Sequence, residues 1–127
     1  MTRTHKIFMF SPVLFAIIPA LLSPYQQGAL DARADIINST PRYLVYGLQK
    51  DGRAFFAEMQ RTYGVTVDAV AGCVVDQKII DHARGYNEVM LAHLNEKYGE
   101  DVLATVRQKL RKQREQLTRT AQPLPVK

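Results

Sequence analysis

The side chains best suited to nucleophilic chemistry are the single cysteine, Cys73, and a histidine nine positions later, His82. A thiol becomes reactive when a neighbouring base or a helix N-terminus stabilises its thiolate. Cys73 lies just before a helix predicted to begin near Gln77, but His82 reaches it only if the preceding strand folds over that helix. Without a C-x-x-C pair, two-thiol disulfide exchange is excluded. The competing interpretations are a buried, inert thiol and a thiol paired between two chains.

Histidine spacing also bears on metal binding. His82 and His93 are eleven positions apart, which is about 16 Å along a helix at 1.5 Å per residue, so they cannot share one ion. His93 with Glu96, or Asp81 with His82, supplies two ligands, fewer than the three or four that zinc needs. We therefore expect no metal and no cofactor.

A glycine in the middle of the same predicted helix, Gly85, precedes Tyr86 and Asn87. Glycine there costs about 1 kcal/mol relative to alanine, which usually indicates close approach by another element. We expect that element to be the strand around Gly72. The functional alternative is a small pocket formed by Cys73, Tyr86 and Asn87, with His82 nearby.

Positive charge is concentrated near the C-terminus. Residues 107–127 contain seven Lys/Arg and one acidic residue, whereas the rest of the chain has ten basic and eleven acidic residues. A nearly neutral body argues against a nucleic-acid-binding domain, and we expect no nucleic-acid partner. On an exported protein this basic stretch would meet an anionic surface or an acidic partner, the alternative being a solvated helix end. The candidate basic surface is Arg107, Lys109, Arg111, Lys112 and Arg114.

Hydrophobic periodicity predicts the elements that position these residues. Strands are expected at 43–46 and 65–75, and helices at about 53–63, 77–98 and from 102 onward, with fraying after Arg114. Asp51, Asp76 and the acidic pair Glu100-Asp101 are placed at helix starts, where they satisfy backbone N–H groups or the helix dipole. The order predicts a small α/β (α+β) fold, β-α-β-α-α, with a short parallel two-stranded sheet covered by helices. Such a thin sheet is marginal alone, so we expect a homodimer.

Residues 23–40 contain Ser-Pro, Gln-Gln-Gly and Asn-Ser-Thr-Pro. These clusters indicate a linker with at most a short helical turn at 30–37. We therefore divide the chain into an N-terminal segment with linker at 1–34, a small α/β domain at 41–118 and a disordered tail at 119–127.

The N-terminal segment has the pattern of an export signal. Arg3, His5 and Lys6 precede an uncharged, apolar run at 7–22, and a basic flank keeps its own side in the cytoplasm. We expect the remainder of the chain to be exported.

Two fates of this segment remain open. Sixteen helical residues span about 24 Å, less than the ~30 Å hydrocarbon core, which favours a cleaved signal and a periplasmic protein. The small-x-small triplet at 32–34, however, lies far from the run, and no lipoprotein cysteine follows it. Residues 7–22 could therefore remain as an inner-membrane anchor.

Glycine and aromatic residues recur at characteristic places in the second half of the chain: Tyr63-Gly64-Val65, Gly72-Cys73-Val74-Val75, Gly85-Tyr86-Asn87 and Glu96-Lys97-Tyr98-Gly99. The chain resembles small exported bacterial proteins with the so-called FEKKY domain, over residues 59–102. At the eponymous pentapeptide, 59–63, this sequence keeps Tyr63 and a basic residue, Arg61. The resemblance implies export and an α/β domain, and the family has no assigned activity.

No phosphate-binding glycine loop, G-x-S-x-G, H-E-x-x-H or catalytic carboxylate pair occurs. The leading hypothesis is therefore a non-catalytic binding module of the bacterial envelope, whose partner is an envelope protein or an anionic surface. The alternatives are a function centred on Cys73 or its pocket, and binding of anionic envelope surfaces by the basic C-terminal helix.

Overall fold

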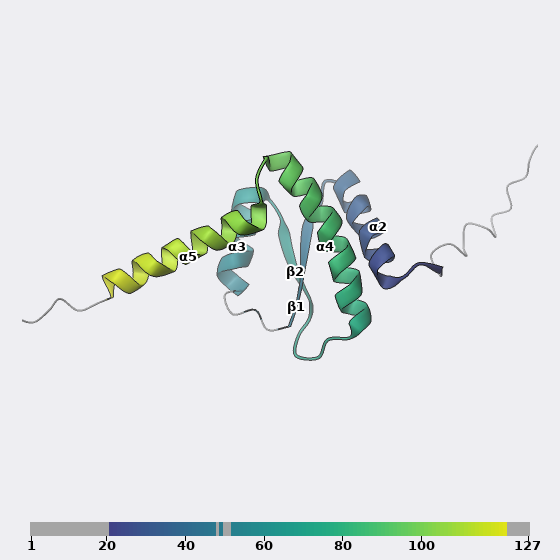
Figure 1. Ribbon diagram of the computed structural model, residues 1–127, viewed down its shortest axis with the longest axis horizontal. Helices are drawn as coiled ribbons and strands as arrows, with labels where there is room; N and C mark the ends of the chain where they lie inside the picture. Colours follow the sequence, from purple (N-terminus) through teal and green to yellow (C-terminus); the bar gives the residue numbers. More distant parts are fainter. Residues whose placement is uncertain (1–20, 48, 50–51, 122–127) are drawn as a thin grey trace, which may run out of the picture.

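The computed structural model describes residues 21–47, 49 and 52–121. They form a small α+β fold in which a short parallel sheet is surrounded by helices (Figure 1). The predicted fold class is confirmed, and the order after residue 41 is the expected β-α-β-α-α. Within the described residues, one α-helix precedes that order. The elements are α2 (Pro24–Ile37), β1 (Arg42–Tyr46), α3 (Gly52–Tyr63), β2 (Thr66–Ala71), α4 (Gln77–Tyr98) and α5 (Val102–Thr120).

The sheet consists of β1 and β2, paired in parallel from Arg42↔Thr66 onward. The register shifts after Val45, so that Tyr46 pairs with Ala71. The strand expected at 65–75 is therefore shorter than predicted, because β2 has no partner beyond the end of β1. Residues 72–74 form a bend that leads into α4.

Helix α2 corrects the interpretation of residues 23–40 as a linker. Ser23 Oγ accepts a hydrogen bond from Gln26 N–H at 3.3 Å, while Gln26 Oε1 accepts one from Ser23 N–H at 3.0 Å. This reciprocal capping box, with Pro24 at the first helical position, starts the helix. The fold therefore includes residues well before 41, with α2 as part of it.

Two glycines let α2 and α4 lie side by side, as Figure 1 shows. A Cβ atom on Gly28 would lie 2.0 Å from the carbonyl oxygen of His82, and one on Gly85 would lie 2.0 Å from that of Tyr25. The expectation that Gly85 permits close packing is confirmed. Its partner is α2, however, and not the strand around Gly72.

The boundaries of α4 are as predicted, and α5 begins at Val102 as expected but ends later than predicted. Asp76 caps α4 by accepting from Lys78 N–H at 3.1 Å, and Gly99 ends it with a left-handed φ of 69°. Asp101 caps α5. Helix α5 does not fray after Arg114 but continues to Thr120, into the stretch expected to be a disordered tail. The remainder of that tail, 122–127, and the expected cap Asp51 lie outside the described residues.

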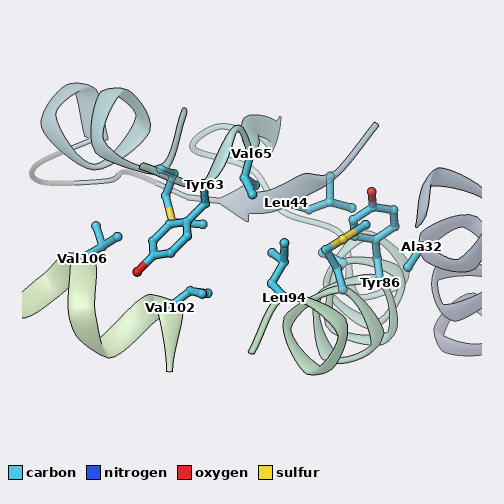
Figure 2. Close-up of a cluster of buried hydrophobic side chains, with 11 residues drawn as sticks. Ala32, Leu44, Tyr63, Val65, Tyr86, Leu94, Val102 and Val106 are labelled. Atoms are coloured by element: carbon cyan, nitrogen blue, oxygen red, sulfur yellow. The ribbon is translucent and has the colours of Figure 1, made fainter. Parts of the chain in front are cut away.

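The hydrophobic core runs as one cluster beneath the sheet and between the helices (Figure 2). Tyr86 and Leu44 lie towards α2, and Tyr63 and Val106 lie between α3 and α5, with Leu94 between the two groups. The core comprises Ala32, Leu44, Met59, Tyr63, Val65, Ala83, Tyr86, Met90, Leu94, Val102 and Val106.

Among the described residues, none of the helices is long and apolar enough to cross a membrane. Residues 1–20, which carry most of the export or anchor segment expected at 7–22, lie outside the described residues.

Candidate functional site

The four candidate pocket residues do not form one pocket. Tyr86 is fully buried, Asn87 lines a groove beside β1, and His82 lines a different depression near the start of α2. Cys73 is exposed in the bend after β2 and lines neither.

The exposure of Cys73 shows that the interpretation as a buried, inert thiol is wrong. Within the described residues Cys73 has no hydrogen bond to His82. The His82 Nε2 atom lies 2.8 Å from Asp31 Oδ2 on α2 instead. The structure therefore does not assemble the thiol–imidazole pair that activation of Cys73 would require. Nor do three His, Cys, Asp or Glu side chains gather anywhere in the described chain to hold a metal ion.

Tyr86 is part of a polar cluster that ties α2 and α4 to the sheet. Its hydroxyl donates to Asp35 Oδ2 at 2.6 Å, and Arg42 donates to the same oxygen at 2.8 Å and to Asp68 at 3.2 Å. The Arg42 guanidinium also lies 5.3 Å from the Tyr86 ring centroid. Burial, followed by the hydrogen bond to Asp35, raises the pKa of Tyr86 above its ordinary value. Burial would raise the pKa of Asp35, but hydrogen bonds from Tyr86 and Arg42 leave it lowered. At neutral pH the Tyr86 hydroxyl donates a hydrogen bond to the Asp35 carboxylate. The cluster therefore has a structural role, holding α2 and α4 to the sheet.

Asn87 closes the outer edge of the sheet. Its Nδ2 donates to the carbonyl oxygen of Leu44 at 2.7 Å, and Leu44 N–H donates to its Oδ1 at 2.8 Å. The neighbouring bonds, Thr66 N–H to Pro41 and Gly47 N–H to Ala71, turn alternate peptide groups towards β2, so those of Leu44 face away from it. One side-chain amide thus makes the two bonds that a third strand would make. The sequence singled out Asn87, but for a different role.

A groove of about 330 Å³ lies beside this edge, between β1, α3 and α5. The rings of Tyr43 and Phe55 meet edge to face at 6.0 Å and form part of its wall. Arg107 also lines the groove, and within the described residues its guanidinium has no ion pair or hydrogen bond. A cation beside aromatic walls can receive an anionic group attached to an apolar body. The lining residues are Tyr43, Leu44, Val45, Tyr46, Gln49, Phe55, Asn87 and Arg107.

Arg107 also begins a row of arginines on α5. At 100° per residue, Arg107, Arg111 and Arg114 lie on one side of the helix, next to Leu110 and Leu117. We call these three arginines the basic row. Residues 111–120 are all exposed, and this half of α5 extends away from the rest of the fold (Figure 1). Three residues of the predicted basic surface, Arg107, Arg111 and Arg114, therefore lie together in the basic row. Lys112 lies on the other side of α5.

The remaining member, Lys109, has a structural role. Its Nζ donates to Glu58 Oε1 at 2.7 Å, where the same carboxylate also accepts from Thr62 and Arg61 at 2.6 Å each. The hydrogen bond from Lys109, followed by those from Thr62 and Arg61, lowers the pKa of Glu58 to about 2. Glu58 is buried, so this cluster fixes the first half of α5 to α3. Sequence reasoning missed it because its partners are 51 positions apart.

This cluster predicts an acid-dependent loss of stability. Because the pKa of Glu58 is lowered in the folded state, its contribution is fully present above the unfolded pKa, near 4.3, and is lost as the pH falls towards 2. We expect Glu58→Gln to reduce the free energy of unfolding by about 2 kcal/mol at neutral pH. The difference from the unsubstituted chain should shrink towards zero near pH 2. Urea unfolding followed by circular dichroism across this pH range checks it. Glu96→Gln, at an exposed position, is the control, and a difference that does not change with pH would contradict the prediction.

The resemblance to FEKKY-domain proteins stays a prediction. A scan against protein-family models, a search of curated proteins and a search of solved structures found no match to this chain.

Proposed function

We propose that this chain is a small, exported, non-catalytic binding domain that recognises an acidic segment of a partner protein. The binding surface is the basic row together with the aromatic groove beside β1. The observation that carries the proposal is the position of Arg107, which belongs to both. A segment bound in the groove would continue directly along the row, so the two features form one surface. Export is inferred from the basic flank and the apolar run of the N-terminal segment.

Charge favours an acidic partner over a second copy of this chain. Residues 107–120 carry six Lys/Arg and one acidic residue, Glu115, and Lys109 is paired with the buried carboxylate of Glu58. Two such helices would repel each other when packed side by side, because like charges at an interface disfavour association. Carboxylates accept paired hydrogen bonds from arginine, which makes an acidic segment the complementary ligand.

The groove adds selectivity to this charge attraction. Tyr43 and Phe55 offer apolar surface beside Arg107, and aromatic rings are effective anchors at protein interfaces. We therefore expect preference for a segment in which an aromatic or aliphatic side chain neighbours a carboxylate. The apolar side chain would enter the groove while the carboxylate pairs with Arg107.

The test uses the full chain and two labelled probes, poly-L-glutamate and a copolymer of glutamate and tyrosine. Fluorescence anisotropy should show binding of both, weakening steeply with salt because the contacts are ionic, and tighter binding of the copolymer. The double variant Arg111→Ala/Arg114→Ala should weaken binding of both probes about tenfold, since exposed ion pairs contribute up to about 1 kcal/mol each and a tenfold change is about 1.4 kcal/mol. Arg107→Ala should also remove the preference for the copolymer.

The matched control is Lys112→Ala/Arg119→Ala, which removes the same charge from the other side of α5. It should retain most of the binding. Equal losses in the two double variants would show attraction to net charge alone and would reject a defined surface. Absence of binding to either probe at low salt would reject the proposal as a whole.

A further inference from the structure

An apolar depression lies at one end of the fold. Unlike the basic row, it is formed mainly by hydrophobic side chains. The start of α2, strand β2 and the first turns of α4 line it. The depression has a volume of about 410 Å³, and its wall is mainly hydrophobic. It is lined by Leu22, Pro24, Gln27, Val70, Lys78, Ile79 and His82.

Hydrophobic side chains around this depression project into solvent. Leu21 is 80% exposed, Val74 is 89% exposed, and Val70 is 38% exposed. We call Leu21, Leu22, Val70, Val74 and Ile79 the apolar end. Scattered single hydrophobic residues are ordinary on a surface, but Leu22, Val70 and Ile79 share the wall of one depression, and Leu21 and Val74 are exposed in the segments that adjoin it. A hydrophobic group of this kind marks a contact with a partner or a membrane.

The charges around the apolar end are compatible with a lipid surface. Lys78 lines the depression as a cation, and a lysine beside apolar side chains can extend its ammonium to lipid headgroups. Asp76, the acidic residue of the adjoining loop, is turned to the helix start, where it accepts from Lys78 N–H. His82 is held by Asp31.

The sequence just before α2 favours a membrane over a protein as the surface that contacts the apolar end. Leu21 and Leu22 are the last residues of the uncharged run at 7–22, and α2 begins two residues later at Pro24. The end of that run is therefore itself part of the apolar end. A run of this hydrophobicity behind a basic flank is of the kind that enters a bilayer.

We propose that the apolar end rests on the bilayer that holds residues 7–22, with Val74 and Leu21 among the lipids and Lys78 at the headgroups. The proposal takes the retained-anchor alternative for the N-terminal segment and is independent of the acidic ligand of α5. Its consequence is orientation: α4 stands away from the membrane, with its C-terminus and the start of α5 distal. The run at 7–22 supplies the attachment, and the apolar end sets the angle of the domain.

The single cysteine provides the probe. Cys73 is exposed and adjoins Val74, so an environment-sensitive fluorophore on it reports the surroundings of the apolar end. The full chain is reconstituted in vesicles of phosphatidylcholine and phosphatidylglycerol, some of whose acyl chains carry a bromine quencher. We expect strong quenching at Cys73. The control carries Cys73→Ser and Glu96→Cys and is labelled about 30 Å away along α4, at 1.5 Å per residue. Its quenching should be several-fold weaker.

Two matched substitutions make the test specific. Val74→Asp should reduce quenching at Cys73 to the level of the distal label, because a carboxylate there opposes contact with lipid. Leu117→Asp makes the same kind of change at another exposed side chain, 72% exposed, on the far half of α5, and should leave quenching unchanged. Both positions are exposed, so neither substitution disturbs the core.

High salt separates this proposal from the acidic-ligand proposal. Apolar contact persists at high salt, whereas binding by the basic row weakens, so either proposal can fail alone. Equal quenching at Cys73 and at the distal label, or quenching at Cys73 that Val74→Asp does not reduce, would overturn the membrane contact. So would a Cys73 label that is already shielded in lipid-free buffer, because a second copy of the chain would then cover the apolar end.

Discussion

Replacing Gly85 by alanine is expected to reduce the free energy of unfolding by about 3 kcal/mol, although alanine is the better helix former. The new Cβ would lie 2.0 Å from the carbonyl oxygen of Tyr25, which is backbone and cannot rotate away. Helix α2 must then move off α4. The move would disrupt the bonds of Tyr86 and His82 to α2, which measure 2.6 and 2.8 Å.

Whether Gly85→Ala lowers or raises the free energy of unfolding distinguishes a steric clash with α2 from the intrinsic helix preference of alanine. If nothing opposed Gly85, alanine would stabilise α4 by about 1 kcal/mol. Gly72→Ala is the control, because no atom lies within 4 Å of its Cβ position and its φ is not left-handed. We expect it to change stability by less than about 0.5 kcal/mol. A Gly85→Ala variant as stable as the unsubstituted chain, measured by urea unfolding, would contradict the close approach.

Gly28 offers an internal check, because its Cβ would meet the carbonyl oxygen of His82 in the same helix pair. Gly28→Ala should be as destabilising as Gly85→Ala. The double variant should lose clearly less than the sum of the two, since once α2 has moved away the second substitution meets no obstacle.

Replacing Asn87 by alanine is expected to reduce the free energy of unfolding by about 2 kcal/mol, because it removes two hydrogen bonds and leaves a strand peptide unpaired. That peptide belongs to Leu44, a buried core residue. Asn87→Asp is the informative variant: its carboxylate can still accept from Leu44 N–H, but it repels the carbonyl oxygen. We expect Asn87→Asp to be less stable than the unsubstituted chain at neutral pH and to recover partly in acid, when the protonated carboxyl can donate.

The control for Asn87 is Asn38→Ala, the same chemical change at an exposed residue after α2. Its effect should be less than half that of Asn87→Ala. Hydrogen exchange of the Leu44 amide gives a local readout, because it should become faster in Asn87→Ala and stay slow in Asn38→Ala. Unchanged exchange at Leu44 would show that Asn87 does not close the sheet edge.

Local signals in the sequence predicted the second half of the fold well. Asp76 and Gly99 delimit α4 at the residues expected, because a cap and a left-handed glycine act through their own backbone neighbours. The parallel pairing of β1 and β2 followed from their separation by a helix. The extent of β2 did not follow, since a strand ends where its partner ends and periodicity does not contain that information.

Helix α2 was missed although its start signal was present. Ser23, Pro24 and Gln26 form a capping box with proline at the first position, but the same residue types also occur in loops. The face that α2 buries carries Gly28 and Ala32, and such small residues add little to a hydrophobic stripe. A helix that packs through small residues is therefore weakly marked in its own sequence, and its evidence lies in the complementary glycine of α4.

The sequence predicted which residues belong to the candidate site better than it predicted how those residues are arranged. Asn87 and Arg107 were singled out separately, one for a pocket and one for a charged surface, and they line the same groove. Their meeting depends on how α5 packs against α3, which Lys109 and Glu58 fix across 51 positions. Contacts of that separation leave no periodic trace in the chain.

The pairing of α2 with α4 also sets the order in which the chain can fold. Its bonds join residues 51 to 63 positions apart, and contacts of such sequence separation form late because the intervening loop must close first. In a chain whose N-terminal flank stays behind while the following residues cross a membrane in order, α2 would cross long before α4. Until then α2 has no surface on which to pack, and a lone helix of 14 residues is marginal in water. In such a chain α2 would therefore stay without its packing partner until α4 had also crossed.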